Sequence, residues 1–349
     1  MAKAAKKSKA KSKAADKSNK KSATAGKAKA KPTTSGALYL SEADVQGLVN
    51  VKDAIATLEL LFETWPDPAT VNLPRQRARI GKGNFNLMGA AWGTGEIFGL
   101  KAYGGGRHHV ALYSSRDGSL QAMIEADHLG RMRTGAASGL ATKLLANPGA
   151  RTLGVIGAGR QALTQVAAVC AVRKIQTVRV FARTAEHRET FAKQIERSLR
   201  VAAEPANSAE AAIGDADVVI TITQSAEPVL RANWLKSGVH VNAAGANAAE
   251  RREIDAETVL RATVRATDHL AQARIEAGEY RDLVAAGRLK WQDVVELGDI
   301  LTEKAPGRRG PADMTLFKSL GIALEDIAFA DLIVRRAHEK GVGRRMPVH

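Results

Sequence analysis

Short apolar runs alternate with stretches of helical spacing over the second half of the chain. Residues 153–156, 177–181, 217–223 and 239–243 are runs of strand length, and 201–204 is a further candidate of the same kind. Runs of this length that are bounded by turn residues predict buried strands rather than helices. Because helical stretches lie between them, the pattern predicts a parallel sheet with right-handed crossovers.

The preceding region has the pattern of an antiparallel sheet with flanking helices. A helix start is predicted at Ser41, and apolar residues repeat at helical spacing from Val51 to Phe62. Pro74 disfavours helix, so residues 71–80 are expected to be extended. Further strands separated by Gly-rich or hairpin-type turns are predicted at 85–91, 97–103, 110–113 and 120–124.

A long helix is predicted between these two regions. Its pattern starts at Asp127, which is expected to cap it, and stops at Pro148-Gly149. A second long amphipathic helix is predicted to end near His338, and Arg344-Arg345 is expected to be a frayed terminus.

The first parallel strand runs directly into a glycine-rich turn, Gly157-Ala158-Gly159-Arg160-Gln161-Ala162. The first glycine allows a tight turn, the second allows close approach of a pyrophosphate, and the alanine allows the helix to pack on the strand. The helix N-terminus offers free N–H groups to the phosphates. Since the motif follows a strand and opens a helix, residues 157–161 are predicted to bind a dinucleotide cofactor.

The end of the second parallel strand predicts which cofactor this site prefers. Sites for NAD usually place an acidic residue there, whereas this chain has Phe181-Ala182-Arg183-Thr184. Arg183 and Thr184 could pair with a 2′-phosphate. The sequence therefore predicts NADPH over NADH, and a solvated surface charge is the alternative for Arg183.

The composition fits a globular protein of two domains that carries a basic tail. The chain has 349 residues, of which 45% are hydrophobic and 25% charged. Residues 1–35 hold 12 Lys and one Asp, so they contribute +11 of the net charge of +16. This Lys-rich tail is expected to be disordered; it could bind nucleic acid or an anionic surface, or be a dispensable solvated extension.

Other sequence features bear on the location of the protein and on whether it binds a metal. No apolar run approaches the length of a membrane span, and the first residues lack the apolar core of a secretory signal, which favours a cytoplasmic protein. The single cysteine, Cys170, is expected to be a buried packing residue. Because His108 and His109 point to opposite faces of a strand, they cannot share a metal. A surface role is favoured for them, and substrate contact by one imidazole near the Gly104–Gly106 turn is the alternative. No metal site is assigned.

Five short sequence blocks follow one another along the chain: Pro74-Arg75 ahead of Met88, Gly99-Leu100-Lys101, Arg133-Thr134-Gly135-Ala136-Ala137-Ser138, the glycine-rich turn, and Thr315-Leu316-Phe317-Lys318-Ser319-Leu320-Gly321. Taken in this order, they resemble the ornithine cyclodeaminase/mu-crystallin family of nicotinamide-dependent enzymes. The resemblance covers nearly all of residues 38–338 and leaves out the tail.

The resemblance implies an α/β fold in which a Rossmann-type parallel-sheet domain is inserted into an α+β domain. Residues 148–314 would be the dinucleotide-binding domain. Residues 36–147 plus 315–343 would be the substrate-binding and dimerisation domain, and 1–35 the tail. Members of the family are homodimers in which the antiparallel sheets meet, and their active site lies between the domains.

By position, the resemblance assigns Arg75, Lys101 and Arg133 to the substrate carboxylate. Three cations from separate elements are costly together unless an anion joins them, and a structural salt bridge is the alternative for each. Lys101 lies in an apolar strand, where its pKa could also be tuned for proton transfer. The resemblance further implies cofactor contacts by Thr134, Ile222, Thr223, Ala244 and Leu320.

Two asparagines depart from the pattern of ornithine cyclodeaminases. Those enzymes have an acidic residue at the position of Asn247, where it handles the amine, and a second acid at the position of Asn86, where it holds the side-chain amine of the substrate. Asparagine cannot act as a general base near neutral pH. Asn86 is therefore expected to contact a different substrate, and Asn247 to hold a water at the catalytic centre.

Together these features predict an NADPH-dependent reductase that acts on the C=N bond of a small α-imino acid. Δ1-Pyrroline-2-carboxylate and Δ1-piperideine-2-carboxylate are the leading candidates, with any proton supplied by Lys101 or by water at Asn247. The alternatives are an ornithine cyclodeaminase and an amino-acid dehydrogenase such as one for alanine. In another class, the chain could be a cofactor-holding or nucleic-acid-associated protein.

Overall fold

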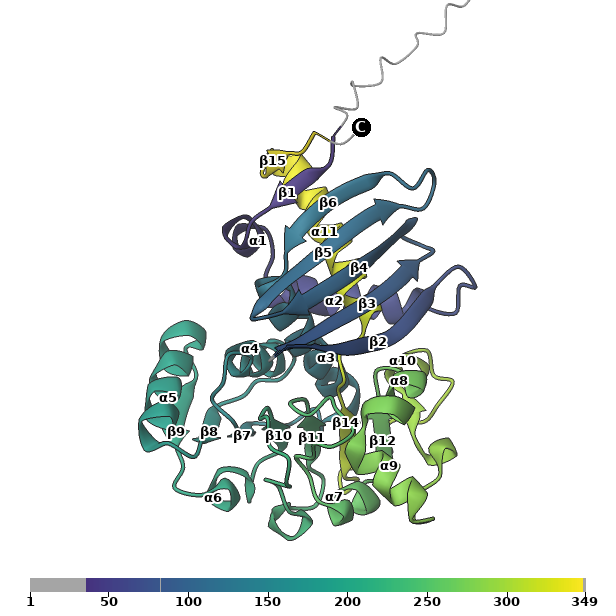
Figure 1. Cartoon of the computed structure of the whole chain (residues 1–349). Helices are drawn as coiled ribbons and strands as arrows, with labels where there is room; N and C mark the ends of the chain where they lie inside the picture. The colour runs from purple at the N-terminus through teal and green to yellow at the C-terminus, as the bar shows by residue number, and fades with distance from the viewer. Residues whose placement is uncertain (1–35, 82, 348–349) are drawn as a thin grey trace, which may run out of the picture. The chain divides into compact units, whose positions relative to one another are not determined.

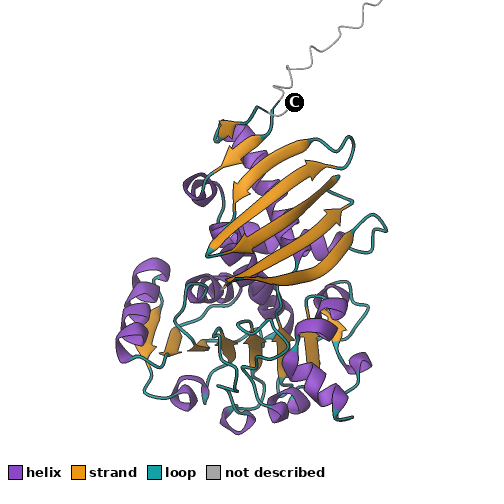
Figure 2. Cartoon of the chain, in the orientation of Figure 1, coloured by secondary structure: helices purple, strands orange, loops and turns teal. Residues whose placement is uncertain are grey.

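Two β-sheets and the helices that cover them make up the described part of the chain (Figure 1). The computed structural model describes residues 36–81 and 83–347, so the Lys-rich tail and its possible contact with nucleic acid lie outside these residues. One sheet is mainly antiparallel with seven strands, and the other is parallel with eight strands (Figure 2).

The seven-stranded sheet is built mostly from the first part of the chain. Its strands are β1 (Leu38–Leu40), β2 (Val71–Ile80), β3 (Gly83–Trp92), β4 (Ile97–Gly104), β5 (Arg107–Ser114), β6 (Leu120–Glu125) and β15 (Arg344–Arg345). They are ordered β15-β1-β6-β5-β4-β3-β2, and every neighbouring pair except β1 with β6 is antiparallel. The predicted antiparallel region is confirmed. The expected fraying of Arg344-Arg345 is wrong, because this pair joins β1 as a strand.

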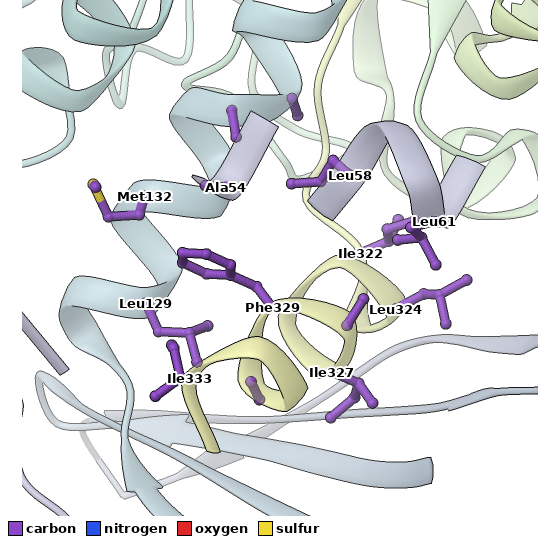
Figure 3. Packing of buried hydrophobic residues seen from close by; sticks show 14 of the residues in the cluster. Ala54, Leu58, Leu61, Leu129, Met132, Ile322, Leu324, Ile327, Phe329 and Ile333 are labelled. Carbon is purple, nitrogen blue, oxygen red and sulfur yellow. The ribbon is translucent and has the colours of Figure 1, made fainter. Parts of the chain in front are cut away.

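Helices cover one face of this sheet. They are α1 (Glu42–Leu48), α2 (Val51–Thr64), α3 (Asp127–Leu145) and α11 (Ala323–Lys340). Leu58 of α2, Leu129 of α3 and Phe329 of α11 belong to one buried apolar cluster beneath the sheet (Figure 3). The opposite face of β2, β3 and β4 carries no helix from the described residues, so its apolar side chains remain open.

The eight-stranded sheet confirms the predicted parallel region. Its strands are β7 (Thr152–Ile156), β8 (Thr177–Phe181), β9 (Ala202–Pro205), β10 (Val218–Thr221), β11 (His240–Ala243), β12 (Val264–Thr267), β13 (Val295–Glu296) and β14 (Thr315–Lys318). Their order is β13-β12-β14-β11-β10-β7-β8-β9. The chain moves outward from β7 in both directions, so the strand order reverses between β7 and β10.

The remaining helices lie in the connections of the parallel sheet. They are α4 (Ala162–Val172), α5 (Ala185–Leu199), α6 (Ala209–Ile213), α7 (Ala256–Arg261), α8 (Leu270–Glu276), α9 (Gly278–Ala285) and α10 (Leu297–Leu301), with 3-10 turns at Ala232–Trp234 and Trp291–Asp293. Among the helices of residues 36–81 and 83–347, none has both the length and the apolar character needed to cross a membrane.

Three local features differ from the expectations. β14 pairs with β11 and β12 inside the parallel sheet, so the chain leaves this sheet after Lys318 and not at residue 315. Asp127 opens α3 without capping it; the Glu42 carboxylate accepts the backbone N–H groups of Asp127 and His128 instead. Cys170 is only partly buried on α4, and burial raises the pKa of its thiol to about 11.

Candidate active site

A cavity of about 780 Å³ lies at the carboxyl ends of the parallel strands. Its wall is formed by the segments that follow β7, β8, β10, β11 and β14, by the start of α3, and by residues of β2 to β5. Open parallel sheets bind ligands where the strand order reverses, which here is between β7 and β10. The volume is typical of a cofactor or small-molecule site.

All but one of the residues predicted for the site line this cavity. They are Arg75, Lys101, Arg133, Thr134, Gly157, Ala158, Gly159, Arg160, Gln161, Arg183, Thr184, Ile222, Thr223, Ala244, Asn247 and Leu320. Asn86 is the exception: its side chain is buried and donates to the carbonyl oxygen of Tyr103 on β4 at 3.4 Å. The structure therefore does not bring Asn86 to the site.

Two positions of the turn after β7 are glycine for different physical reasons. Gly157 has a φ of +118°, and a Cβ there would lie 2.4 Å from the carbonyl oxygen of Ile222. The turn itself therefore requires glycine at 157. Gly159 has no positive φ, and a Cβ there would meet no protein atom within 4 Å. The space beside Gly159 opens on the cavity.

The start of α4 offers unsatisfied polar groups to this space. α4 begins at Ala162 without a side-chain cap. Next to it, the buried Oε1 of Gln161 has no hydrogen-bond partner within the described residues. Free N–H groups at a helix N-terminus bind phosphate, and a buried amide oxygen needs a donor. With the open space at Gly159, these groups fit the pyrophosphate and ribose of a dinucleotide.

The cavity rim after β8 is cationic. Arg183 and Thr184 are exposed there beside His187 of α5. The guanidinium of Arg183 has no hydrogen bond or ion pair with any residue that the structure describes. Arg160 differs, since its NH1 lies 2.6 Å from Asp127 Oδ1. Arg183 is therefore the arginine of this rim that is free to bind an anion.

Arg75 begins a group of buried cations at the other end of the cavity. The pairing of β2 with β3 shifts between Leu73 and Gln76, and such a bulge turns a side chain away from the regular direction of its strand. Arg75 NH1 lies 2.6 Å from Glu276 Oε2, and its NH2 donates to the carbonyl oxygens of Leu320 and Gly321. These contacts hold the guanidinium in the cavity wall.

Lys101 and Arg133 share a carboxylate of α11. Lys101 Nζ lies 2.7 Å from Asp326 Oδ1, and Arg133 Nε lies 3.0 Å from the same oxygen. Arg133 NH1 also lies 2.9 Å from Glu325 Oε2. Each of the three predicted substrate-binding cations is thus paired with a protein carboxylate and also lines the cavity. Both expectations therefore apply to these residues: each forms a salt bridge within the protein, and each also lines the cavity.

Burial sets the charge of this cluster. Burial raises the pKa of Glu325 to about 8, and the neighbouring Asp268 and Asp326 add to the rise. Burial alone would also raise the pKa of Asp326, yet Arg133 and Lys101 hold it below its usual range. The pKa of Lys101 is lowered, because burial outweighs the attraction of Asp326. With a pKa of about 8, Glu325 is mostly protonated at neutral pH and then does not neutralise Arg133. Part of the positive charge of Lys101 and Arg133 is therefore available to an anionic ligand.

A family model described as the ornithine cyclodeaminase/mu-crystallin family matches residues 37–341. The chain belongs to this family. The match spans all elements that line the cavity and every strand of both sheets except β15.

Proteins named for reductase or dehydrogenase activities are similar to this chain in sequence and in fold. The chain is 37% identical over 238 residues to a Δ1-pyrroline-2-carboxylate reductase of Bacillus cereus, covering 68% of this chain and 73% of the relative. The Δ1-pyrroline-2-carboxylate reductase of Thermococcus litoralis, solved with NADH and L-proline, matches with a TM-score of 0.85 and 30% identity, covering 88% of this chain and all of that one. An archaeal alanine dehydrogenase dimer with bound NAD matches with a TM-score of 0.84 and 28% identity, over 90% of this chain and all of that one.

His108 lines the cavity, which agrees with the substrate contact that the sequence left open and not with the surface role that it favoured. Its ring stacks on Tyr103 with centroids 5.2 Å apart, and its Nδ1 lies 3.7 Å from Asp127 Oδ1. Burial, together with Lys101 and Arg160, lowers the pKa of His108, which favours a neutral imidazole near pH 7. The pairing of the two strands could have revealed this position, because Lys101 and Tyr103 share one face and His108 is opposite Tyr103.

The side chain of Asn247 is open to a ligand. Its backbone carbonyl oxygen accepts a hydrogen bond from Arg77, while its amide has no hydrogen-bond partner among the described residues. Over residues 36–81 and 83–347, no three His, Cys, Asp or Glu side chains are grouped so that they could hold a metal ion.

Proposed function

We propose that this chain is an NAD(P)H-dependent reductase of a small α-imino acid. A cyclic ketimine such as Δ1-pyrroline-2-carboxylate or Δ1-piperideine-2-carboxylate is the leading substrate. The observation that carries the proposal is the position of Arg75, Lys101 and Arg133 at one end of a cavity whose other end fits a dinucleotide. The relatives that reduce Δ1-pyrroline-2-carboxylate, one of them solved with NADH and L-proline, support this substrate class.

The three cations bind the substrate carboxylate and so orient the C=N bond. Arg75 is fixed by Glu276 and by two carbonyl oxygens, and Arg133 is fixed by the side chains of Glu325 and Asp326 of α11. Donors that are held in place before the ligand arrives need no reorganisation during the reaction. Their charges lie in a buried site, where electrostatic attraction for a carboxylate is stronger than in water.

Reduction adds a hydride to the imine carbon and a proton to the nitrogen. The reduced nicotinamide supplies the hydride when it is bound, and is itself oxidised. A neutral imine takes its proton from Lys101 Nζ, whose lowered pKa suits a donor closer to neutral pH. A protonated imine needs no further acid, so a side chain such as Asn247 that only orients water is sufficient.

Ornithine cyclodeamination is disfavoured by the charge of the cavity wall. A substrate with a second ammonium group needs a carboxylate near it, but residue 247 is asparagine and Asn86 lies outside the wall. Asp127 is the only acidic residue among the described residues of the wall, and it is paired with Arg160. Oxidation of an amino acid is the second candidate function, because the fold is similar to that of the archaeal alanine dehydrogenase.

The deciding experiment compares substrates with the purified full-length chain. We expect cyclic imino acids to consume NADPH, measured by its absorbance, and to yield the saturated amino acid. Ornithine with catalytic NAD should give no proline or ammonia, and alanine with NAD should react more slowly than the imine does. Ornithine turnover without imine reduction would overturn the proposal, and no turnover by a folded, NADPH-bound protein would favour a binding role.

The cofactor preference is proposed to be for NADPH and to depend on Arg183. Its exposed guanidinium is free, and charge-assisted hydrogen bonds to a 2′-phosphate are worth about 1.5–3 kcal/mol. We expect Arg183→Ala to raise the KM for NADPH about 30-fold and to leave the KM for NADH nearly unchanged. Steady-state rates with each cofactor measure both values.

A matched control for this variant lies at the far end of α5, the helix that follows Arg183. Arg197 is exposed in the last turn of α5 and is not part of the cavity wall, so Arg197→Ala should change neither KM. Equal specificity constants of the wild-type protein for NADPH and NADH would contradict the preference.

A homodimer is proposed to form through the open face of the antiparallel sheet. An apolar groove of about 530 Å³ crosses β2, β3 and β4 there, and Leu73, Leu87, Phe98 and Leu100 are each more than a third exposed. Exposed apolar surfaces of this kind mark interaction sites. The dimer of the archaeal alanine dehydrogenase supports a second copy as the partner.

Leu87→Asp is expected to weaken this dimer about 100-fold, because a carboxylate would be buried without a partner on each side of the two-fold axis. Light scattering after size-exclusion chromatography should then give the mass of one chain at micromolar concentration. Leu60→Asp, at an exposed leucine of α2 outside the groove, is the control and should keep the mass of two chains. If the wild-type protein has the mass of one chain at that concentration, the proposed dimer is wrong.

We further infer that residues 148–318 act as the cofactor domain. All eight parallel strands lie within this range, including β14, which extends the domain beyond the expected end at residue 314. Residues 36–147 with 319–343 would then form the substrate and dimerisation domain.

A further inference from the structure

The segments that follow β10 and β11 meet at a single buried carboxylate, that of Glu253. Its Oε1 accepts the backbone N–H of Thr223 at 2.6 Å and the Thr223 hydroxyl at 2.8 Å. Its Oε2 accepts the N–H groups of Gly245 at 2.6 Å and Ala246 at 3.0 Å. Thr223 and Gly245 line the cavity, while Glu253 is fully buried behind them. One side chain therefore joins two parts of the cavity wall.

The charge of Glu253 is satisfied by these donors alone. No described Lys, Arg or His forms an ion pair with it. Hydrogen bonds to an ionised acceptor are about twice as strong as neutral ones, and four of them converge here. The fit is close, since a Cβ on Gly245 would lie 2.6 Å from Glu253 Oε1 and 2.2 Å from the carbonyl oxygen of Thr223.

The backbone of Glu253 is held from the opposite side. Its N–H donates to Glu279 Oε1 at 3.1 Å, and Glu279 is fixed by the buried Lys318 at 3.0 Å. Its carbonyl oxygen accepts the N–H groups of Val229 and Leu230. Because both its backbone and its carboxylate are fixed, Glu253 can set the distance between the two wall segments.

The strand order indicates which part of the cofactor these segments face. Arg183, proposed to bind the 2′-phosphate, follows β8, and the glycine turn follows β7. The next strands on the far side of β7 are β10 and then β11. A dinucleotide that places its adenosine at β8 and its pyrophosphate at β7 therefore extends its nicotinamide toward the ends of β10 and β11.

We propose that Glu253 is a positioning residue that holds the wall segments at Thr223 and Gly245 in the arrangement that receives the nicotinamide. This inference rests on the proposed cofactor site, though not on the identity of the substrate.

The test is Glu253→Gln. Glutamine has a single acceptor oxygen, so its NH2 group must face the donors of one wall segment, which is then released. We expect the Kd for NADPH to rise about tenfold, while the Kd for 2′-phospho-ADP-ribose, which lacks the nicotinamide, stays within about twofold. Calorimetric titration of the full-length protein measures both without any turnover.

Asp255→Ala is the matched control from the same segment. Asp255 accepts the N–H of Thr258 at 2.9 Å as the cap of α7 and does not line the cavity. Its loss should lower Tm and leave both dissociation constants unchanged. If Glu253→Gln does not fold, Glu253→Asp keeps the charge but is one methylene too short to reach both segments, and the same pattern is expected.

Three outcomes would overturn the inference. They are unchanged NADPH affinity in the Glu253 variant, equal losses for NADPH and for the fragment, and failure of the wild-type protein to bind either nucleotide. Absence of imine reduction by a wild-type protein that binds NADPH would overturn the proposed substrate and leave the role of Glu253 standing.

Discussion

Replacing Lys101 by methionine is expected to lower kcat/KM for reduction of the imino acid by about 1,000-fold. The ammonium group is one of the three cations proposed to bind the substrate carboxylate, and it is also the proposed proton donor. Methionine keeps the apolar stem and removes both functions. Initial rates at saturating NADPH with varied imino acid measure the loss, and NADPH affinity should stay near that of the wild type.

Lys101→Met is also expected to destabilise the folded protein, so its control is a variant that loses stability without losing a cavity residue. The substitution leaves the buried Asp326 carboxylate with Arg133 as its remaining partner, and breaking a buried pair costs on the order of 3 kcal/mol. Arg336→Met breaks another ion pair of α11, with Asp53, away from the cavity wall. It should lower Tm and keep kcat/KM per folded molecule. A Lys101→Met protein that is folded and as active as the wild type would contradict the role of Lys101.

The fold could be predicted where a local pattern decides the structure. The parallel strands at 152–156 and 177–181 are apolar runs between helices, and the glycine turn follows the first of them, so periodicity and turn chemistry agree. β14 was missed because its four residues follow a long loop and carry no period of their own. β15 was missed because Arg344–Arg345 becomes a strand only by pairing with β1, some 300 residues earlier in the chain.

The cations of the candidate site could be predicted, but their partners could not. Arg75, Lys101 and Arg133 lie in short motifs, whereas Glu276 and Asp326 are separated from them by about 200 residues. No periodicity along the chain connects groups at that distance. The raised pKa of Glu325 depends on its burial beside Asp268 and Asp326, which only the packed structure defines.

Asn86 is absent from the cavity wall for a related reason. The resemblance assigns it to the substrate from its place in the sequence, and the residue does lie in a strand beside the site. Its side-chain amide donates to the carbonyl oxygen of Tyr103 on the neighbouring strand β4, so a shared position in the sequence did not determine access to the cavity.

Gly159→Val is expected to raise the Kd for NADPH by at least about 100-fold while leaving the stability of the cofactor-free protein unchanged. Nothing inside the protein explains a glycine here, because its φ is not positive and a Cβ would meet no protein atom within 4 Å. The side chain would instead occupy the cavity beside the start of α4, where the pyrophosphate is proposed to lie.

Two other glycines make this result specific. Gly149→Val places the same side chain at an exposed position that is also free of contacts and lies outside the cavity, so Kd and Tm should both stay near wild type. Gly157→Val should lower Tm as well as affinity, because its backbone is left-handed and its Cβ would meet Ile222. Thermal unfolding with and without NADPH separates the three cases. A Gly159→Val protein that NADPH stabilises as much as the wild type would show that the cofactor's phosphates lie elsewhere, and the proposed orientation of the dinucleotide along β8, β7 and β10 would then be wrong.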